Sequence, residues 1–168
     1  MGDTLKAISA ARTGLILDSP FFGALALRLK VKIDPGCSTA YTDGTVLGFN
    51  PDFVDALTSQ ELKGLVAHEV MHCACGHPWR KGNRDHKRSN IAMDYAINGE
   101  LINDDFDGKS YEWIYDRLPP DSDGDGDGDG EGEGDGEQPG EVRDAPQPGD
   151  GESLTEQDWQ QATNQAAA

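Results

Sequence analysis

The sequence predicts an α+β fold: a small domain with a three-stranded, mostly antiparallel sheet, two helices that carry residues of metal-ligand type, and a disordered acidic tail. Apolar residues alternate with polar ones between residues 24 and 33, and two short extended runs follow before residue 50. Apolar residues then recur at helical spacing in two later runs, one beginning at residue 58 and one over about residues 89–101. After residue 118 the chain turns to Gly, Pro, Asp and Glu, which bury too little apolar surface to fold. We therefore expect a folded domain over residues 1–118, a disordered segment over 119–152 and a short helical segment over 153–168.

The first part of the chain should form a helix followed by the sheet. Thr4–Leu17 mixes apolar and polar residues as an amphipathic helix does. Strict alternation over Ala24–Ile33 favours a half-buried strand. Two further extended runs, Ser38–Thr42 and Thr45–Phe49, are joined by Asp43-Gly44, a dipeptide preferred in tight hairpin turns. These runs would complete a mostly antiparallel sheet with Thr45–Phe49 at its edge.

The helices that follow have start and stop signals. Asn50-Pro51 ends the sheet and begins a short helical turn. Thr58 and Glu61 have the spacing of a capping box, directly before an apolar-periodic run. That helix should end at Gly76, with Pro78 preventing its resumption and a polar loop following. A second helix is expected over about residues 89–101, and a third over 110–118.

The first of these helices contains the run His68-Glu69-Val70-Met71-His72. Residues four apart share one face of a helix, so both imidazoles could reach one metal ion with Glu69 beside them. This HExxH pattern is typical of zinc hydrolases, in which zinc lowers the pKa of a water molecule toward about 7 and the glutamate takes its proton. We expect Zn²⁺ as the cofactor, His68 and His72 as ligands and Glu69 as the general base.

A catalytic zinc ion has three protein ligands and one open position, so a third ligand is needed. His77 follows closely, but on a continuous helix it would lie opposite the histidine pair, and it could bind only if the chain bends at Gly76. Asp94 lies on the next expected helix, with Asn90 and Asn98 one turn away on either side to hold ligands by hydrogen bonds. Asp94 is the preferred third ligand, and His77 stays the alternative.

At these residues the chain resembles a known family. The run His68–Arg80, followed by Asn90–Gly99, is similar to the metallopeptidase domain found before von Willebrand factor A-like domains in bacterial and phage proteins. The pattern over Phe21–Phe53 and the later Gly140–Asp144 are similar too, whereas the repetitive acidic stretch departs from the family's pattern. The resemblance implies a small zincin-like, specifically gluzincin-like, fold: an N-terminal helix, a twisted sheet whose edge strand can pair with an extended substrate, the active-site helix and the third-ligand helix.

Charge and composition restrict the partners. Of the formal net charge of −17, residues 119–152 carry −12 and residues 1–118 only −3, so the acidity belongs to the tail, which could engage a protein partner. The basic loop Arg80–Arg88 has no interleaved aromatic residues, so nucleic-acid binding is not favoured. The Asp-Gly repeats match neither the EF-hand loop nor the nine-residue calcium-binding repeats.

The setting expected from the sequence is cytoplasmic. No basic region followed by an apolar run marks a signal peptide, and no stretch approaches the roughly 18 apolar residues of a membrane helix. The three cysteines form an odd set without the spacing of a zinc ribbon, which favours free thiols in a reducing compartment.

The function predicted from these patterns is that of a zinc-dependent metallohydrolase, more specifically a peptidase acting on a peptide or protein. The rival prediction is a non-catalytic zinc-containing binding or regulatory module in a phage or bacterial assembly. Glu69 favours the enzyme, because a structural zinc site needs no base at that position.

Overall fold

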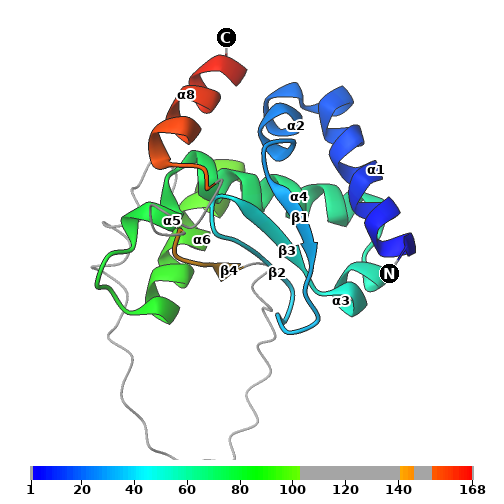
Figure 1. Ribbon diagram of the computed structural model, residues 1–168, viewed down its shortest axis with the longest axis horizontal. Coiled ribbons are helices and arrows are strands. Elements are labelled where there is room, and N and C mark those ends of the chain that lie inside the picture. The colour runs from blue at the N-terminus through cyan, green and yellow to red at the C-terminus, as the bar shows by residue number, and fades with distance from the viewer. Residues whose placement is uncertain (1, 103–140, 146–152, 168) are drawn as a thin grey trace, which may run out of the picture. The chain divides into compact units, whose positions relative to one another are not determined.

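The computed structural model describes residues 2–102, 141–145 and 153–167, and its fold is α+β (Figure 1). The chain divides into two compact units. The first contains Met1–Gly82 and Pro139–Ala168, and it holds the sheet and most of the described helices. The second contains Asn83–Gln138, of which helix α6, His86–Ile102, is described. This helix includes the expected range 89–101, whereas the helix expected over 110–118 lies outside the described residues.

The N-terminal region is more helical than the sequence predicts. Helix α1, Gly2–Asp18, confirms the first expected helix. One strand was expected over Ala24–Ile33. The structure has helix α2, Pro20–Ala26, at the start of that range and strand β1, Lys30–Ile33, at its end, so the prediction is wrong for the first residues and right for the last. Pro20 sits in the first turn of α2, where the missing N–H and fixed φ favour a helix. Gly23 lets α2 lie close on α1, because a Cβ there would be 2.5 Å from the backbone of Ile16.

The sheet is mixed. Its remaining strands are β2, Ala40–Thr42, β3, Val46–Phe49, and β4, Glu141–Val142, and the order is β1-β3-β2-β4. Strands β2 and β3 pair antiparallel, but β1 is parallel to β3 and β4 is parallel to β2. The prediction of a mostly antiparallel sheet is therefore wrong. After β1 the chain crosses to the far side of β3 before forming β2, which also places β3 inside the sheet rather than at its edge.

The hairpin between β2 and β3 forms at the expected dipeptide. The Asp43 carboxylate Oδ1 accepts hydrogen bonds from the backbone N–H groups of Thr45 and Val46, at 2.8 and 2.7 Å. Gly44 has a φ of +85°, a conformation that glycine adopts at little cost. The turn is therefore stabilised by the aspartate and permitted by the glycine.

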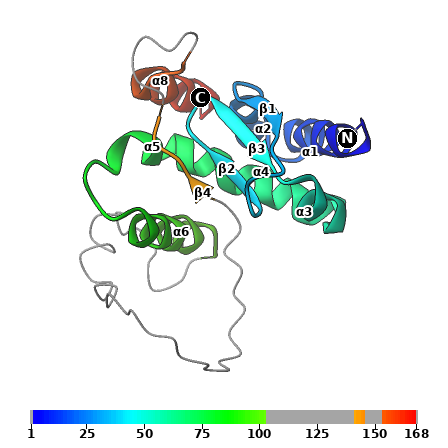
Figure 2. The same cartoon turned by 60° about the horizontal axis from the view of Figure 1, so that its bottom comes forward.

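Helix α4, Ser59–Ala74, follows helix α3, Pro51–Ala56, and lies against the sheet, as two views show (Figures 1 and 2). Its capping box is confirmed: Thr58 Oγ1 accepts from the Glu61 N–H at 3.2 Å, and the Glu61 carboxylate accepts from the Thr58 N–H at 2.8 Å. The helix ends just before Gly76, whose φ is +73°. Instead of a loop, a short helix α5, His77–Arg80, follows at once, because Pro78 starts a new helix here rather than preventing one.

The C-terminal part of the chain completes the first unit. Residues 141–145 fall within the segment expected to be disordered, yet they are described and supply β4. Helix α8, Glu156–Ala166, lies in the expected helical segment 153–168 and packs against α2 and α4. Trp159 is 1 % exposed, belongs to the hydrophobic core and donates from its indole N–H to the Gly44 carbonyl at 2.6 Å. Among the described helices, we find none with the length and apolar character to cross a membrane.

Candidate metal centre

The core of the candidate site is a pair of histidines on α4. His68 and His72 are one helical turn apart, and both side chains are buried. Their Nε2 atoms lie 3.0 Å from each other, with the two ring planes inclined by 74°. The capping box at the start of α4 and the turn at Gly76 set the length of the helix that presents them. The geometry follows from the spacing of the two residues, because positions four apart stack on one helix face.

This pair suits a transition-metal ion. Two nitrogen ligands at about 2.0–2.1 Å from a tetrahedral zinc ion lie roughly 3.3 Å apart. The observed separation of the two Nε2 atoms is close to that value. Imidazole nitrogen is a ligand that favours zinc, copper, iron and nickel over calcium or magnesium. The pair thus provides two ligand atoms in nearly the right relation for one ion.

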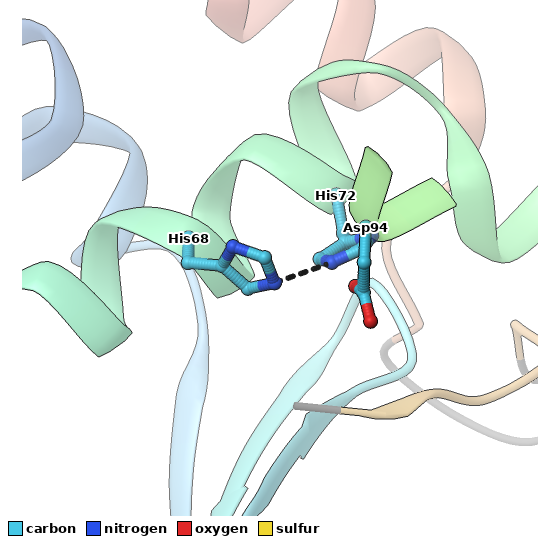
Figure 3. A group of neighbouring side chains, drawn as sticks. All are labelled: His68, His72 and Asp94. Atoms are coloured by element: carbon cyan, nitrogen blue, oxygen red, sulfur yellow. Dashed lines mark hydrogen bonds between the residues drawn. The ribbon is translucent and has the colours of Figure 1, made fainter. Parts of the chain in front are cut away.

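In the described part of the chain, one group of side chains could hold a metal ion, and it consists of His68, His72 and Asp94 (Figure 3). Each offers one ligand atom, and these atoms all lie within 4.8 Å of one another. Asp94 comes from α6 and is 3 % exposed. Two imidazoles and one carboxylate form a common ligand set for a catalytic zinc ion, which keeps a fourth position open.

Glu69 follows His68 on α4, and its side chain is fully buried. Glu69 is thus a buried carboxylate adjacent in sequence to one member of the histidine pair. One turn further along α4, Cys73 packs against β2, with its Sγ 3.2 Å from Thr42 Oγ1. Burial raises the pKa of the Cys73 thiol, and the charge of Glu69 raises it further. Cys73 is therefore an uncharged packing residue next to the site.

His77, the alternative third ligand, lies on the other side of His72. Its Nδ1 is 2.9 Å from Nδ1 of His72, whereas His72 directs its Nε2 toward His68. The chain does bend at Gly76, and the bend brings His77 against a histidine of the pair rather than into the group of possible ligands. Burial lowers the pKa of His77 well below its usual value, and the neighbouring His72 lowers it further. Sequence reasoning treated His77 only as a ligand, because spacing alone does not show which ring nitrogen it would face.

The chain matches a known protein family over most of its length. A family model described as "Putative metallopeptidase domain" matches residues 4–167. No curated protein matches the chain, and no solved structure does. The matched range extends through β4 and α8, so the family model spans the C-terminal segment as well as the histidine pair.

Proposed function

Because the chain belongs to the family described as "Putative metallopeptidase domain", we propose that it is a zinc-dependent peptidase whose metal ligands are His68, His72 and Asp94. The observation that carries the proposal is the convergence of the two Nε2 atoms at 3.0 Å, next to a buried glutamate. The substrate class is peptide or protein.

The chain's own residues supply the steps around the metal. The two imidazoles and the Asp94 carboxylate would hold a zinc ion and leave one coordination position for water or a substrate carbonyl. A zinc ion held there would supply Lewis-acid chemistry to whichever of the two occupies that position. Glu69 takes the proton from the attacking water and delivers it to the leaving amine as the peptide bond breaks. The burial of these side chains strengthens each electrostatic interaction among them.

The proposal is tested by measuring zinc content and peptide hydrolysis on the same preparations of the full chain. Wild type should bind one zinc ion and cleave members of an unstructured peptide library. Glu69→Gln should retain zinc but lose activity by at least 10²-fold, since a general base contributes about 10²–10⁴. His72→Ala and Asp94→Ala should lose both the bound zinc and the activity. Asp52→Asn, which changes an exposed acid on α3, should match wild type in both measurements.

Two results would contradict the proposal. If the wild-type protein binds no zinc, the proposed metal site is refuted. Wild type that binds zinc but hydrolyses no peptide, with Glu69→Gln indistinguishable from it, favours the non-catalytic zinc-binding module instead.

A further inference from the structure

We propose that His77 is a positioning residue for the metal centre, which holds the His72 ring by a hydrogen bond so that His72 directs Nε2 at the ion. The inference rests on the proposed function for the existence of that ion. In this role His77 is neither a metal ligand nor the general base. Every contact that carries it lies within the first compact unit, Met1–Gly82 with Pro139–Ala168.

The two nitrogens of His72 face different partners. Nε2 lies 3.0 Å from His68 Nε2, and Nδ1 lies 2.9 Å from His77 Nδ1. A neutral imidazole carries its proton on one nitrogen and a lone pair on the other. A proton on His72 Nδ1, donated to His77, therefore leaves the lone pair on Nε2, where a metal ion would bind. The hydrogen bond selects the tautomer of His72 and fixes the angle of its ring.

His77 can act in this way because its own position is firmly held. Gly76 turns the chain with a φ of +73°, and Pro78 fixes the backbone directly after His77. The carbonyl of Pro78 accepts a hydrogen bond from the Ala145 N–H at 3.1 Å. Since α5 is only four residues long, these contacts on either side of His77 add to the few constraints that so short a helix provides.

Two further contacts tie α5 to the rest of the unit. The ring of Trp79 lies directly against Gly44 in the hairpin turn, where a Cβ would be 2.5 Å from it. Just after α5, the ammonium of Lys81 forms an ion pair with Asp144 at 2.9 Å, and Lys81 is buried. The segment after β4 and the β2–β3 turn thus hold α5 in place, α5 holds His77, and His77 orients His72.

The test uses the full chain and Co²⁺ as a spectroscopic probe, with Zn²⁺ affinity measured by competition. His77→Leu removes the acceptor and should weaken metal binding by about 10–100-fold, the usual cost of removing a residue that orients a ligand. The visible absorption bands of bound Co²⁺ should also change, because the angle of the His72 ring changes. A purely structural role in the core would lower thermal stability without altering these bands.

Two amide variants provide a matched pair that keeps the test decisive even if His77→Leu does not fold. The side chain of His77→Asn places its oxygen near the position of Nδ1, whereas that of His77→Gln reaches the position of Nε2. Asn should therefore restore metal affinity and the cobalt spectrum better than Gln. His86→Ala, which removes an exposed histidine at the start of α6, should leave both unchanged.

The outcomes separate this inference from the proposed function. If wild type binds neither Zn²⁺ nor Co²⁺, the proposed metal centre itself is refuted. If wild type binds them and His77→Leu binds equally well with an unchanged spectrum, only the positioning role is overturned. Equal behaviour of the Asn and Gln variants would also overturn it, because the hydrogen bond at Nδ1 would then make no difference.

Discussion

Single residues decide how closely the elements of the first unit approach, and Gly44 illustrates this. Its φ is +85°, its carbonyl accepts the Trp159 indole N–H, and its Cα faces the ring of Trp79. A side chain at this position meets two separate obstacles: the backbone conformation and the indole ring. The hairpin turn, α5 and α8 are therefore brought together at a residue that has no side chain.

Gly44→Ala should lower the free energy of unfolding by more than the roughly 1–3 kcal/mol of an unfavourable backbone conformation, because the new methyl group also displaces Trp79. The measurement is urea-induced unfolding of metal-free protein. Gly82→Ala is the matched control: its φ is +59°, but a Cβ there would have nothing within 4 Å. Equal losses for the two variants would show that contact with Trp79 contributes nothing.

At the scale of elements, α4 combines strong local signals with contacts to several other elements of the first unit. The capping box begins it, Gly76 follows its end, and one face packs against the sheet and α1. The histidine pair lies in the second half of the helix, away from the fraying first turn. The cap therefore stabilises the helix that carries the two histidines, although the capping residues lie away from the histidines.

Thr58→Ala should lower the free energy of unfolding by about 1 kcal/mol. Thr58→Ser should retain most of this stabilisation, since serine keeps the capping hydroxyl. The hydrogen bonds from Thr58 lower the pKa of Glu61 below its usual 4.5. This contribution is complete above that value and is lost as the pH falls through the lower pKa of the folded protein. The difference between wild type and Thr58→Ala, measured on metal-free protein, should therefore shrink on acidification. A difference independent of pH would contradict the reciprocal bond.

At the scale of the whole molecule, the first unit is assembled from two parts of the sequence. Strand β4 pairs with β2, and α8 adds Trp159 to a core formed mainly by α1, α2, α4 and the sheet. The backbone N–H of Leu154 donates to Thr45 Oγ1 at 3.1 Å, which joins the start of this segment to the β2–β3 turn. Residues 83–138 are thus an insertion in sequence between two parts of one compact unit.

Trp159→Ala should cost about 3–5 kcal/mol of unfolding free energy, as expected for a fully buried aromatic side chain. Gln160→Ala, the exposed neighbour on the same helix, should stay within about 0.5 kcal/mol of wild type. Unfolding of the full chain in urea measures both. Similar small effects for the two variants would mean that α8 does not contribute to the core.

The sequence predicts best what is encoded locally. Thr58 and Glu61 are three residues apart, and the two site histidines four apart, so both arrangements follow from helix geometry alone. The strand expected over 24–33 fails at its start because contacts of α2 with α1 and α4 outweigh an alternating pattern. The pairing of β4 and the contact of His77 with His72 depend on tertiary structure that no local spacing encodes.

The late position of Trp159 in the chain has a consequence for biosynthesis. A ribosome delivers α4, with its histidine pair, more than eighty residues before it delivers this tryptophan. Until then the core of the first unit lacks this side chain, the largest of the fully buried ones among the described residues. Strand β4, the partner of β2, is itself synthesised only shortly before Trp159. Because these contacts join residues far apart in sequence, their formation is slow relative to that of a local helix. The nascent chain therefore carries His68 and His72 on a helix whose surrounding core is incomplete until residues 141–159 have been synthesised.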